Sequence, residues 1–462
     1  MAADSASRAK EIARRLAWPL AIWAISAAVY VAVAGPRTSG PTADNHFVHL
    51  ADSFLHGELG VLGNRPPGTN DWACYDRETQ DICPPSAFSR PRDSQRWYVS
   101  FPPFPAIVIL PAVAIFGPGL SDALFWALFA GLAPALLFAV LRRLRESGRS
   151  GRSLRDDLLL TTLFAFGSVL FFTAVQGAVW FAGHVVGVVV ILAYLYFALD
   201  ARRPALAGLM LGLAFITRPT TAALVLFFAI EALRVSRKGP EPDYGDQPSV
   251  PKRVFLWLTR VEWRPVMRRW AIFAAPILVI GGLAMWMNAE RWEDPFEFGH
   301  RYLMIRWRAR IETWGLFSYH YLSKNLAIFL ASLPWLTAHE PHVIISRHGL
   351  ALWFTTPALL LALWPRRVDA QLVALYLAAG AVCLWNLLYQ NSGWVQFGYR
   401  FALDYLPFVF VAIALGGRRF GPGFLAAMVF AIAVNTFGAI TFDRAWQYYD
   451  DDGTQDRVFQ PD

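Results

Sequence analysis

The stretch DNHFVHLADSFLHGEL, from Asp44 to Leu59, decides how the rest of the chain is interpreted. Read as a helix, it has an apolar face at the i, i+3, i+4, i+7 spacing, formed by Phe47, Leu50, Ala51, Phe54 and Leu55. A polar stripe occupies another face and consists of Asn45, His49, Asp52 and His56. Asp44 stands at the N-cap position. Such a helix can lie in a membrane interface, with lipid on its apolar side and a cavity on its polar side.

The composition is that of a membrane protein. Hydrophobic residues make up 56% of the 462 positions and charged residues 16%, and the mean hydropathy is +0.37. Several apolar runs exceed the roughly 18 residues that a spanning helix needs. The net charge of +8 is concentrated in short loops between these runs, which the positive-inside rule explains better than a nucleic-acid partner does. We therefore expect contact with membrane lipids and none with nucleic acid.

The predicted fold is all-α: one polytopic transmembrane helix bundle over residues 1–462, with about 11 spans and with interfacial helices on its outer face. No small-residue cleavage site follows the first apolar run, which predicts a retained span from Leu16 to Ala34. The basic residues then place 35–120 as the first extracytoplasmic loop, 235–269 as a cytoplasmic loop and 441–462 as an extracytoplasmic tail. The expected location is a bacterial-type plasma (inner) membrane.

Two apolar segments are expected not to cross. If residues 101–117, with their four prolines, spanned the membrane alone, the arginine-rich loop 142–157 would lie outside, against the positive-inside rule. Residues 326–336 are too few to cross. Both segments are therefore predicted to lie at the outer interface.

Two local patterns predict specific contacts. Cys74 and Cys83 lie in the polar first loop with eight residues between them. In an oxidising compartment they would form a disulfide that closes a short hairpin, the alternative being two free thiols. The sequence GLMLG at 208–212 is a small-xxx-small pattern, typical of close helix packing.

The candidate chemistry gathers on the predicted outer face, where ionisable groups are costly unless they have a role. Asp44 is the candidate general base, because a carboxylate beside arginines suits a reaction on a phosphate-linked substrate. The substrate-binding candidates are His46, His49, Asp52, Arg218, His300, Arg301, Arg400 and Asp404. Other outer-loop groups include Glu58, Arg90, Arg92, Arg96 and His184. Simpler roles stay open: Asp44 as a helix cap only, Arg218 as a snorkelling side chain, and each histidine as a structural or solvated residue.

A metal is a weaker hypothesis. His49, Asp52 and His56 stand at i, i+3 and i+7, so one helix face could offer a carboxylate and two imidazoles to a divalent metal. Polar helical stripes are more often simply solvated. The sequence contains no phosphate-cradling glycine loop, HExxH motif or nucleophile elbow, so ATP is not indicated.

Several phrases resemble the glycosyltransferase-C superfamily, which includes protein mannosyltransferases and the lipid A aminoarabinose transferase. These phrases are DNHFVHLADSFLHGEL, WYVSFPPFPAIVILPAVAIFG, ALAGLMLGLAFITRPT and GWVQFGYRFALDYLPF, together with a span ending LRRLR. The resemblance implies a polyprenyl-phosphate sugar donor, inverting transfer on the extracytoplasmic face, and an acidic base in the first outer loop, where Asp44 matches. Many relatives carry a second acidic residue directly after the first. Here Asn45 stands there, which leaves Asp44 to act alone or with His46.

Two functions from different classes remain. The first is a glycosyltransferase, such as a hexosyltransferase of the mannosyltransferase-like kind, acting on a lipid, glycan or protein acceptor. The alternative is a polytopic transporter or flippase of lipid-linked glycans without catalytic activity. Transporters tend to show internal repeats and charged residues at the membrane midplane. This sequence shows no repeat, and its ionisable residues gather at one face, which favours the enzyme.

Overall fold

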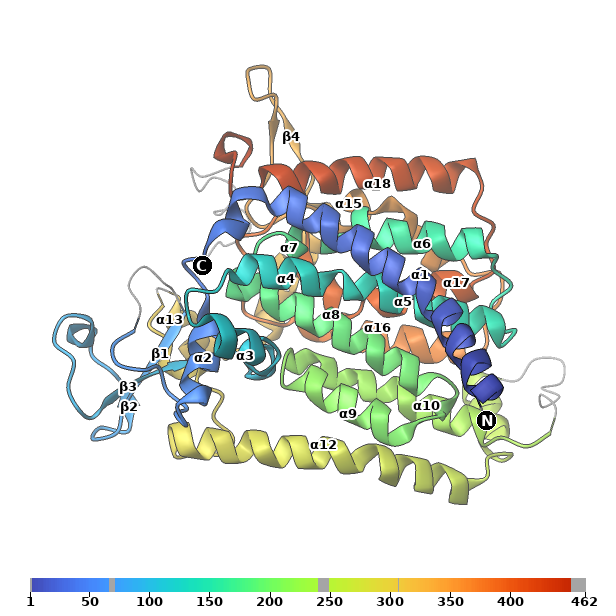
Figure 1. Cartoon of the computed structure of the whole chain (residues 1–462), viewed down its shortest axis with the longest axis horizontal. Coiled ribbons are helices and arrows are strands. Elements are labelled where there is room, and N and C mark those ends of the chain that lie inside the picture. The colour runs from blue at the N-terminus through green and yellow to red at the C-terminus, as the bar shows by residue number, and fades with distance from the viewer. Residues whose placement is uncertain (1, 66–70, 240–248, 306, 450–462) are drawn as a thin grey trace.

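The computed structural model describes residues 2–65, 71–239, 249–305 and 307–449. It is mostly helical, and its long helices run side by side along one axis, with the N-terminus at one end of the bundle (Figure 1). The opposite end carries α2 and a small sheet. The long helices are α1 (Ala2–Ala34), α8 (Val179–Ala198), α12 (Trp263–Trp292), α16 (Ala370–Leu387) and α18 (Pro422–Thr441).

Shorter elements complete the bundle and its ends. The shorter α-helices are α2 (His46–Leu55), α3 (Phe104–Phe116), α4 (Asp122–Ala130), α5 (Leu132–Glu146), α6 (Leu154–Phe166), α7 (Leu170–Ala174), α9 (Pro204–Phe215), α10 (Val225–Val235), α11 (Val250–Leu258), α13 (Arg308–Trp314), α14 (Leu322–Ala331), α15 (Leu352–Thr355) and α17 (Leu406–Leu415). The 3₁₀ turns are η1 (Gly35–Ser39), η2 (Pro85–Phe88), η3 (Leu199–Ala201), η4 (Pro219–Leu224), η5 (His300–Tyr302), η6 (Tyr319–Tyr321), η7 (Pro357–Leu363), η8 (Arg400–Asp404) and η9 (Trp446–Tyr448).

The multi-span membrane character is confirmed by length and composition. Six segments of the described chain are long and apolar enough to cross: Arg15–Ser39, Asp122–Glu146, Val179–Ala201, Trp263–Trp292, Ala370–Leu387 and Pro422–Thr441. The count of about 11 spans stays a prediction, because other expected spans are short or broken. Residues 158–176 form α6 and α7, which are separated at Gly167. Residues 349–364 form only the short α15 and the turn η7, which begins at Pro357.

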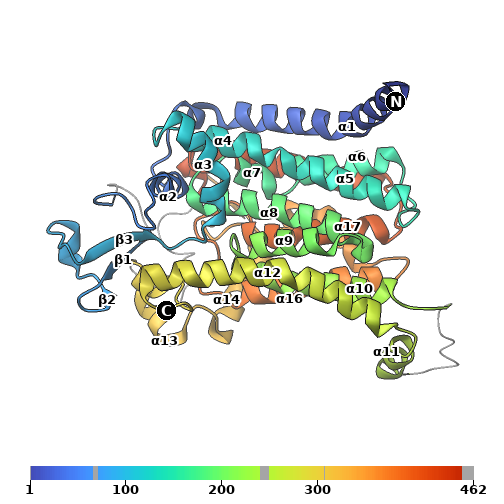
Figure 2. The ribbon, with the colours of Figure 1, turned by 60° about the horizontal axis from the view of Figure 1, so that its bottom comes forward.

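Helix α8 lies at the centre of the bundle. Of its apolar stretch, 83% of residues are buried, against 17% for α1 and for α12, and these two helices lie on opposite sides of the molecule (Figure 2). The sequence of α8 is apolar on nearly every side, as expected of a helix that packs on all its faces. Helices α1 and α12 instead turn apolar side chains outward, which suits contact with lipid.

The small-xxx-small pattern packs α9 against α12, as predicted. A Cβ added at Gly212 would lie 2.7 Å from Ile280 Cδ1, and one added at Gly208 would overlap the backbone carbonyl of Phe273. These two glycines therefore let the two helix backbones approach closely.

Helix α2 differs from its prediction in two ways. It begins at His46, with Asn45 at the N-cap position and no capping hydrogen bond from the Asn45 side chain, so Asp44 is the residue before the N-cap. Most of its apolar face is buried against protein rather than lipid, although Leu55 at its end is 43% exposed. Phe47 is 3% exposed, its ring lies 6.4 Å from that of Trp126, and α3 packs alongside the helix. The expected apolar face is thus real, but it faces the bundle.

The first loop contains a small antiparallel sheet, so the all-α prediction is wrong in this detail. Strands β1 (Trp72–Asp76), β2 (Asp81–Ile82) and β3 (Gln95–Val99) pair in the order β2-β1-β3. The predicted Cys74–Cys83 disulfide is confirmed and ties β1 to the residue after β2. Strands β4 (Trp335–Leu336) and β5 (Val343–Ile344) form a separate hairpin, which takes up the end of the apolar segment 326–336.

Helix α3 begins and ends at the same end of the bundle. Phe104 N donates to the carbonyl of Ile216 at 3.2 Å, and the start of the next helix, Asp122, accepts from Thr42. With 13 residues, α3 is about 20 Å long, shorter than the roughly 30 Å core of a bilayer. This geometry agrees with a helix that does not cross, while its place on the outer face stays a prediction.

We predict that Ser147 and Ser89 lie on opposite sides of the membrane. Arg142 donates to the carbonyl of Arg15, so the loop containing the exposed Ser147 lies beside α1, and Ser89 follows η2 near the sheet. In a Cys383→Ser background, S89C should react with an impermeant maleimide in intact cells. S147C should react only after permeabilisation, and its labelling in intact cells would contradict this topology.

We predict that the unreduced, denatured protein has one alkylatable thiol, Cys383, and that reduction raises the number to three. Replacing Cys74 and Cys83 with serine should lower the melting temperature, since closing a short loop typically contributes about 2–4 kcal/mol. A Cys383→Ser control should show no alkylation before reduction. Three alkylated thiols in the unreduced wild type would refute the disulfide.

Candidate functional site

Buried polar side chains gather where η4 and η8 meet one face of α8. Trp180, His184 and Gly187 recur on this face at the i, i+4, i+7 spacing. His184 Nδ1 lies 3.4 Å from Asp404 Oδ1 of η8. Arg218, which precedes η4, lies against Gly187, because a Cβ added there would be 3.1 Å from Arg218 Cγ. Glycine at this position thus leaves room for the arginine stem.

Asp404 is the centre of this group and accepts hydrogen bonds from three side chains. Arg218 donates from Nε to Oδ1 at 3.0 Å and from Nη2 to Oδ2 at 2.9 Å. Thr220 Oγ1 and Asn386 Nδ2 each donate to Oδ2 at 3.2 Å. A carboxylate that is 1% exposed needs such partners, because removing an ion from water is costly. We call Asp404, Arg218, Thr220, Asn386 and His184 the Asp404 cluster.

The structure brings the predicted residues Arg218 and Asp404 together, and Arg218 retains one nitrogen for another ligand. Its Nε and Nη2 are engaged by Asp404, whereas Nη1 donates to none of the described residues. The side chain is 23% exposed, and the guanidinium lies 5.0 Å from the centroid of the Phe401 ring. The Arg218 guanidinium is therefore fixed in orientation, but not all of its N–H groups donate hydrogen bonds to the described residues.

Arg400 is used differently. Its side chain lies near the cluster but is buried, and its Nη1 donates to the backbone carbonyls of Gly393 and, at 2.8 Å, Val395. The guanidinium stacks over the Phe181 ring, 5.0 Å from the centroid. These contacts hold the loop before η8, so Arg400 is better placed to support the cluster than to bind a ligand directly.

Asp71 is a carboxylate that sequence reasoning missed. Its Oδ2 accepts a hydrogen bond from Trp180 Nε1 at 2.6 Å, one helical turn before His184 on α8. Its φ of +61° lies in the left-handed region that few residues other than glycine adopt. Burial raises the pKa of Asp71, partly opposed by the Trp180 hydrogen bond. Its sequence context, after Pro, Gly and Asn, suggested only a turn.

Asp44 lies at the same end of α8. Its backbone carbonyl accepts a hydrogen bond from Val179 N, the first residue of α8, at 2.9 Å, and its side chain is half-buried. Val179 precedes Trp180, the partner of Asp71. Two acidic residues from different segments are therefore tied to the first turn of α8, Asp44 through its backbone carbonyl and Asp71 through its carboxylate.

The predicted metal site does not form. Among the residues that the structure describes, no group of three or more His, Cys, Asp or Glu side chains could hold a metal ion. His49 lies edge-on to Trp72, with 6.0 Å between ring centroids. His56 comes after the end of α2, and its Nδ1 lies 2.8 Å from the backbone carbonyl of Asp52. His56 also lies 3.7 Å from the Asp52 carboxylate, but the His49 ring packs on Trp72 instead of joining them.

His46 and His49 contribute packing around Trp72. His46 is fully buried and stacks on Trp72 at 4.3 Å between ring centroids. Burial lowers the pKa of His49, against the opposing effect of Asp52, so its ring is neutral near pH 7. The two histidines thus fix α2 against the sheet, near the first turn of α8.

The predicted residues His300 and Arg301 belong to a different layer. They lie in η5, which packs on β1. Burial lowers the pKa of His300 to about 4, so its ring is neutral near pH 7 and offers no charge to a phosphate. Arg301 is exposed and lies 5.2 Å from the centroid of the Tyr302 ring. No hydrogen bond or ion pair among the described residues joins His300 or Arg301 to the Asp404 cluster.

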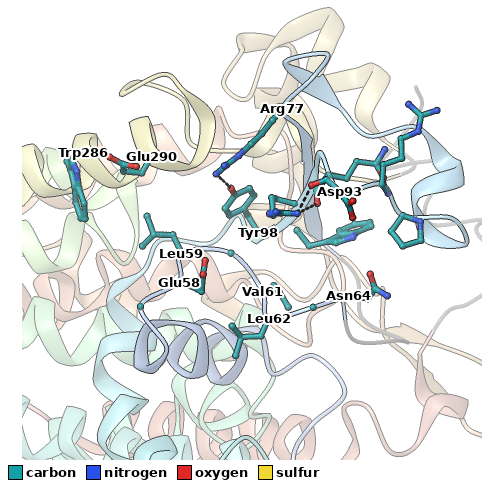
Figure 3. A pocket seen from close by; sticks show the side chains of 18 residues that line it. Glu58, Leu59, Val61, Leu62, Asn64, Arg77, Asp93, Tyr98, Trp286 and Glu290 are labelled. Carbon is teal, nitrogen blue, oxygen red and sulfur yellow. Dashed lines mark hydrogen bonds between the residues drawn. The ribbon is translucent and has the colours of Figure 1, made fainter.

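A groove of about 800 Å³ lies between residues 57–64, β3 and one end of α12 (Figure 3). Its charged lining comprises Arg77, Arg92, Arg96, Glu58, Asp93 and Glu290, three cations and three anions. Trp286 projects from α12 on one side, and Tyr98 accepts a hydrogen bond from Arg77 on the other. The groove collects some of the expected outer-loop groups but no member of the Asp404 cluster, so the two sites are distinct.

Comparisons with protein-family models, curated proteins and solved structures found no match for this chain.

We predict that Asp404→Asn lowers the melting temperature in detergent by an amount corresponding to about 3–5 kcal/mol, because it leaves the Arg218 guanidinium without its counter-charge. The double variant Asp404→Asn, Arg218→Gln should recover part of this loss, since it removes both charges. Asp81→Asn, an exposed carboxylate on β2, serves as the control. Equal melting temperatures for Asp404→Asn and the wild type would contradict the role given to this pair.

Proposed function

We propose that this protein is an inverting membrane glycosyltransferase that transfers a sugar from a polyprenyl-phosphate donor to an extracytoplasmic lipid, glycan or protein. The observation that carries the proposal is Arg218, a partly exposed guanidinium that a buried carboxylate holds in place. The planar fork of arginine suits phosphate oxygens. A polyprenyl phosphate that departs from a sugar gains charge, and a fixed donor such as Nη1 stabilises it.

Asp44 is the proposed general base. The acceptor hydroxyl oxygen attacks the anomeric carbon, the bond from that carbon to the phosphate oxygen breaks, and the electron pair leaves with the phosphate. The hydroxyl proton passes to the Asp44 carboxylate. Asp71 is the second candidate base, because it is tied to the same turn of α8, and its raised pKa increases its affinity for a proton.

The proposed site faces outward from a plasma membrane. The Cys74–Cys83 disulfide supports this, since disulfides persist in oxidising compartments. The charge pattern supports it too: α2 and β1, which directly follow Asn45 and Asp71 in sequence, lie at the end of the bundle opposite the N-terminus (Figure 1). The last turns of α5, before the arginine-rich loop, lie beside Arg15.

We predict that Asp44→Asn lowers the rate of transfer by roughly 10²–10⁴, the usual effect of removing a general base. Asparagine keeps the volume and one side-chain oxygen that can accept a hydrogen bond, and the backbone carbonyl still accepts from Val179 N, so the melting temperature should change little. Mass spectrometry of membrane lipids and envelope glycans, in cells with the wild-type or D44N protein, measures the product. Asp71→Asn is compared in parallel, and Asp81→Asn serves as the control.

Wild-type product levels in folded D44N would remove Asp44 as the base, and loss of product in D71N alone would transfer the role to Asp71. The non-catalytic transporter is tested with purified protein in detergent micelles. A micelle does not separate two compartments, so transfer of sugar from donor to acceptor in micelles requires an enzyme. If no sugar is transferred from donor to acceptor, the result would favour the transporter.

A further inference from the structure

Gly183 is a buried glycine beside empty space. It lies in the middle of the first half of α8 and is buried, yet a Cβ added there would meet no atom within 4 Å. Among the described glycines with this much room, Gly183 alone is buried. Gly282 on α12 and Gly380 on α16 also have room, but they are exposed.

Helix packing does not explain this glycine. At Gly212 an added Cβ would collide with the neighbouring helix, so glycine is needed there for close approach. At Gly183 no neighbour approaches, and glycine weakens a helix relative to alanine. Glycine at position 183 therefore keeps a space open and is not required for close packing of two helices.

The space lies between the two polar groups of the site. On a helix with 3.6 residues per turn, Gly183 shares its face with Trp180 and Gly187. Trp180, about one turn before Gly183, donates to Asp71. Gly187, about one turn after Gly183, contacts the stem of Arg218. Gly183 thus lies on α8 between Trp180, which binds the Asp71 carboxylate, and Gly187, which contacts the Arg218 stem.

A polar ligand would also complete the local hydrogen bonding. His184 is 1% exposed, and its Nε2 has no hydrogen-bond partner among the described residues. Buried polar atoms are normally paired. His184 directly follows Gly183 on α8, and we take its unpaired imidazole nitrogen as a sign that a molecule with hydroxyl or carbonyl groups belongs at this turn.

We propose that the space beside Gly183 is the subsite for the sugar ring of the lipid-linked donor, and that Gly183 limits the size of the sugar accepted. This inference rests on the proposed function. The phosphate meets Arg218, and the ring, with its hydroxyl groups, lies along α8 towards Trp180 and Asp71. Gly183 is a specificity-determining residue, because its lack of a side chain sets the size of the subsite and it takes no part in the reaction.

The test uses Gly183→Ala, Gly183→Val and Gly183→Leu in the full-length protein, with Gly282→Leu as the matched control on an exposed helix face. Native mass spectrometry measures binding of a panel of polyprenyl phosphates that carry a neutral hexose or pentose, and of the same polyprenyl phosphate without a sugar. Melting temperatures check folding, and Gly183→Ala should be at least as stable as the wild type.

For the tightest-binding sugar lipid, affinity should fall stepwise with side-chain size, by roughly tenfold or more for leucine, the scale on which a pocket rejects an oversized group. Binding of bare polyprenyl phosphate should be unchanged, as should all binding in Gly282→Leu. Normal affinity for the sugar lipid in folded Gly183→Leu would overturn the subsite and leave the proposed function standing. A wild-type protein that binds none of the polyprenyl phosphates would overturn both.

Discussion

The arrangement of the site depends on one buried ion pair, between Arg218 and Asp404. It joins the turn before η4 to η8, across 186 positions of sequence, and Asn386 at the end of α16 binds the same carboxylate. A carboxylate inside an apolar bundle is tolerated only when its lone pairs are occupied. The position of three segments around α8 is therefore fixed by the requirement to satisfy Asp404, and Arg218 acquires its orientation as a result.

Much of the bundle could be predicted from sequence because apolar length and charge asymmetry are properties of single segments. The runs that became α1, α8, α12, α16 and α18 were visible in this way, and so was the close packing at Gly208 and Gly212. The disulfide was foreseen from spacing and compartment. The broken spans were not, because a proline or glycine inside an apolar run signals a kink, a break or a re-entrant segment equally well.

The site was predicted only in part, because local sequence patterns describe single segments and not the contacts between them. Arg218 and Asp404 were named from their places at the ends of apolar runs, but their pairing is a long-range contact that no local pattern encodes. Asp71 was missed because its neighbours in sequence form an ordinary turn, while its significance comes from the indole of Trp180. The metal hypothesis failed because the spacing of residues on a helix does not show where their imidazole rings pack. His49 packs on Trp72, whereas His56 contacts Asp52, so no metal-binding group of three forms among the described residues.

The separation of the partners in the Asp404 cluster also has a consequence for biosynthesis. His184 and Arg218 enter the membrane well before Asn386 and Asp404 have been made, and at about 5–20 residues per second the interval is on the order of 10–40 s. During that interval the Arg218 guanidinium has no carboxylate from Asp404. In a chain that stops before Asp404, the Arg218 guanidinium therefore stays at the membrane boundary without this carboxylate. The site is complete only after the segment that contains Asp404 has been inserted.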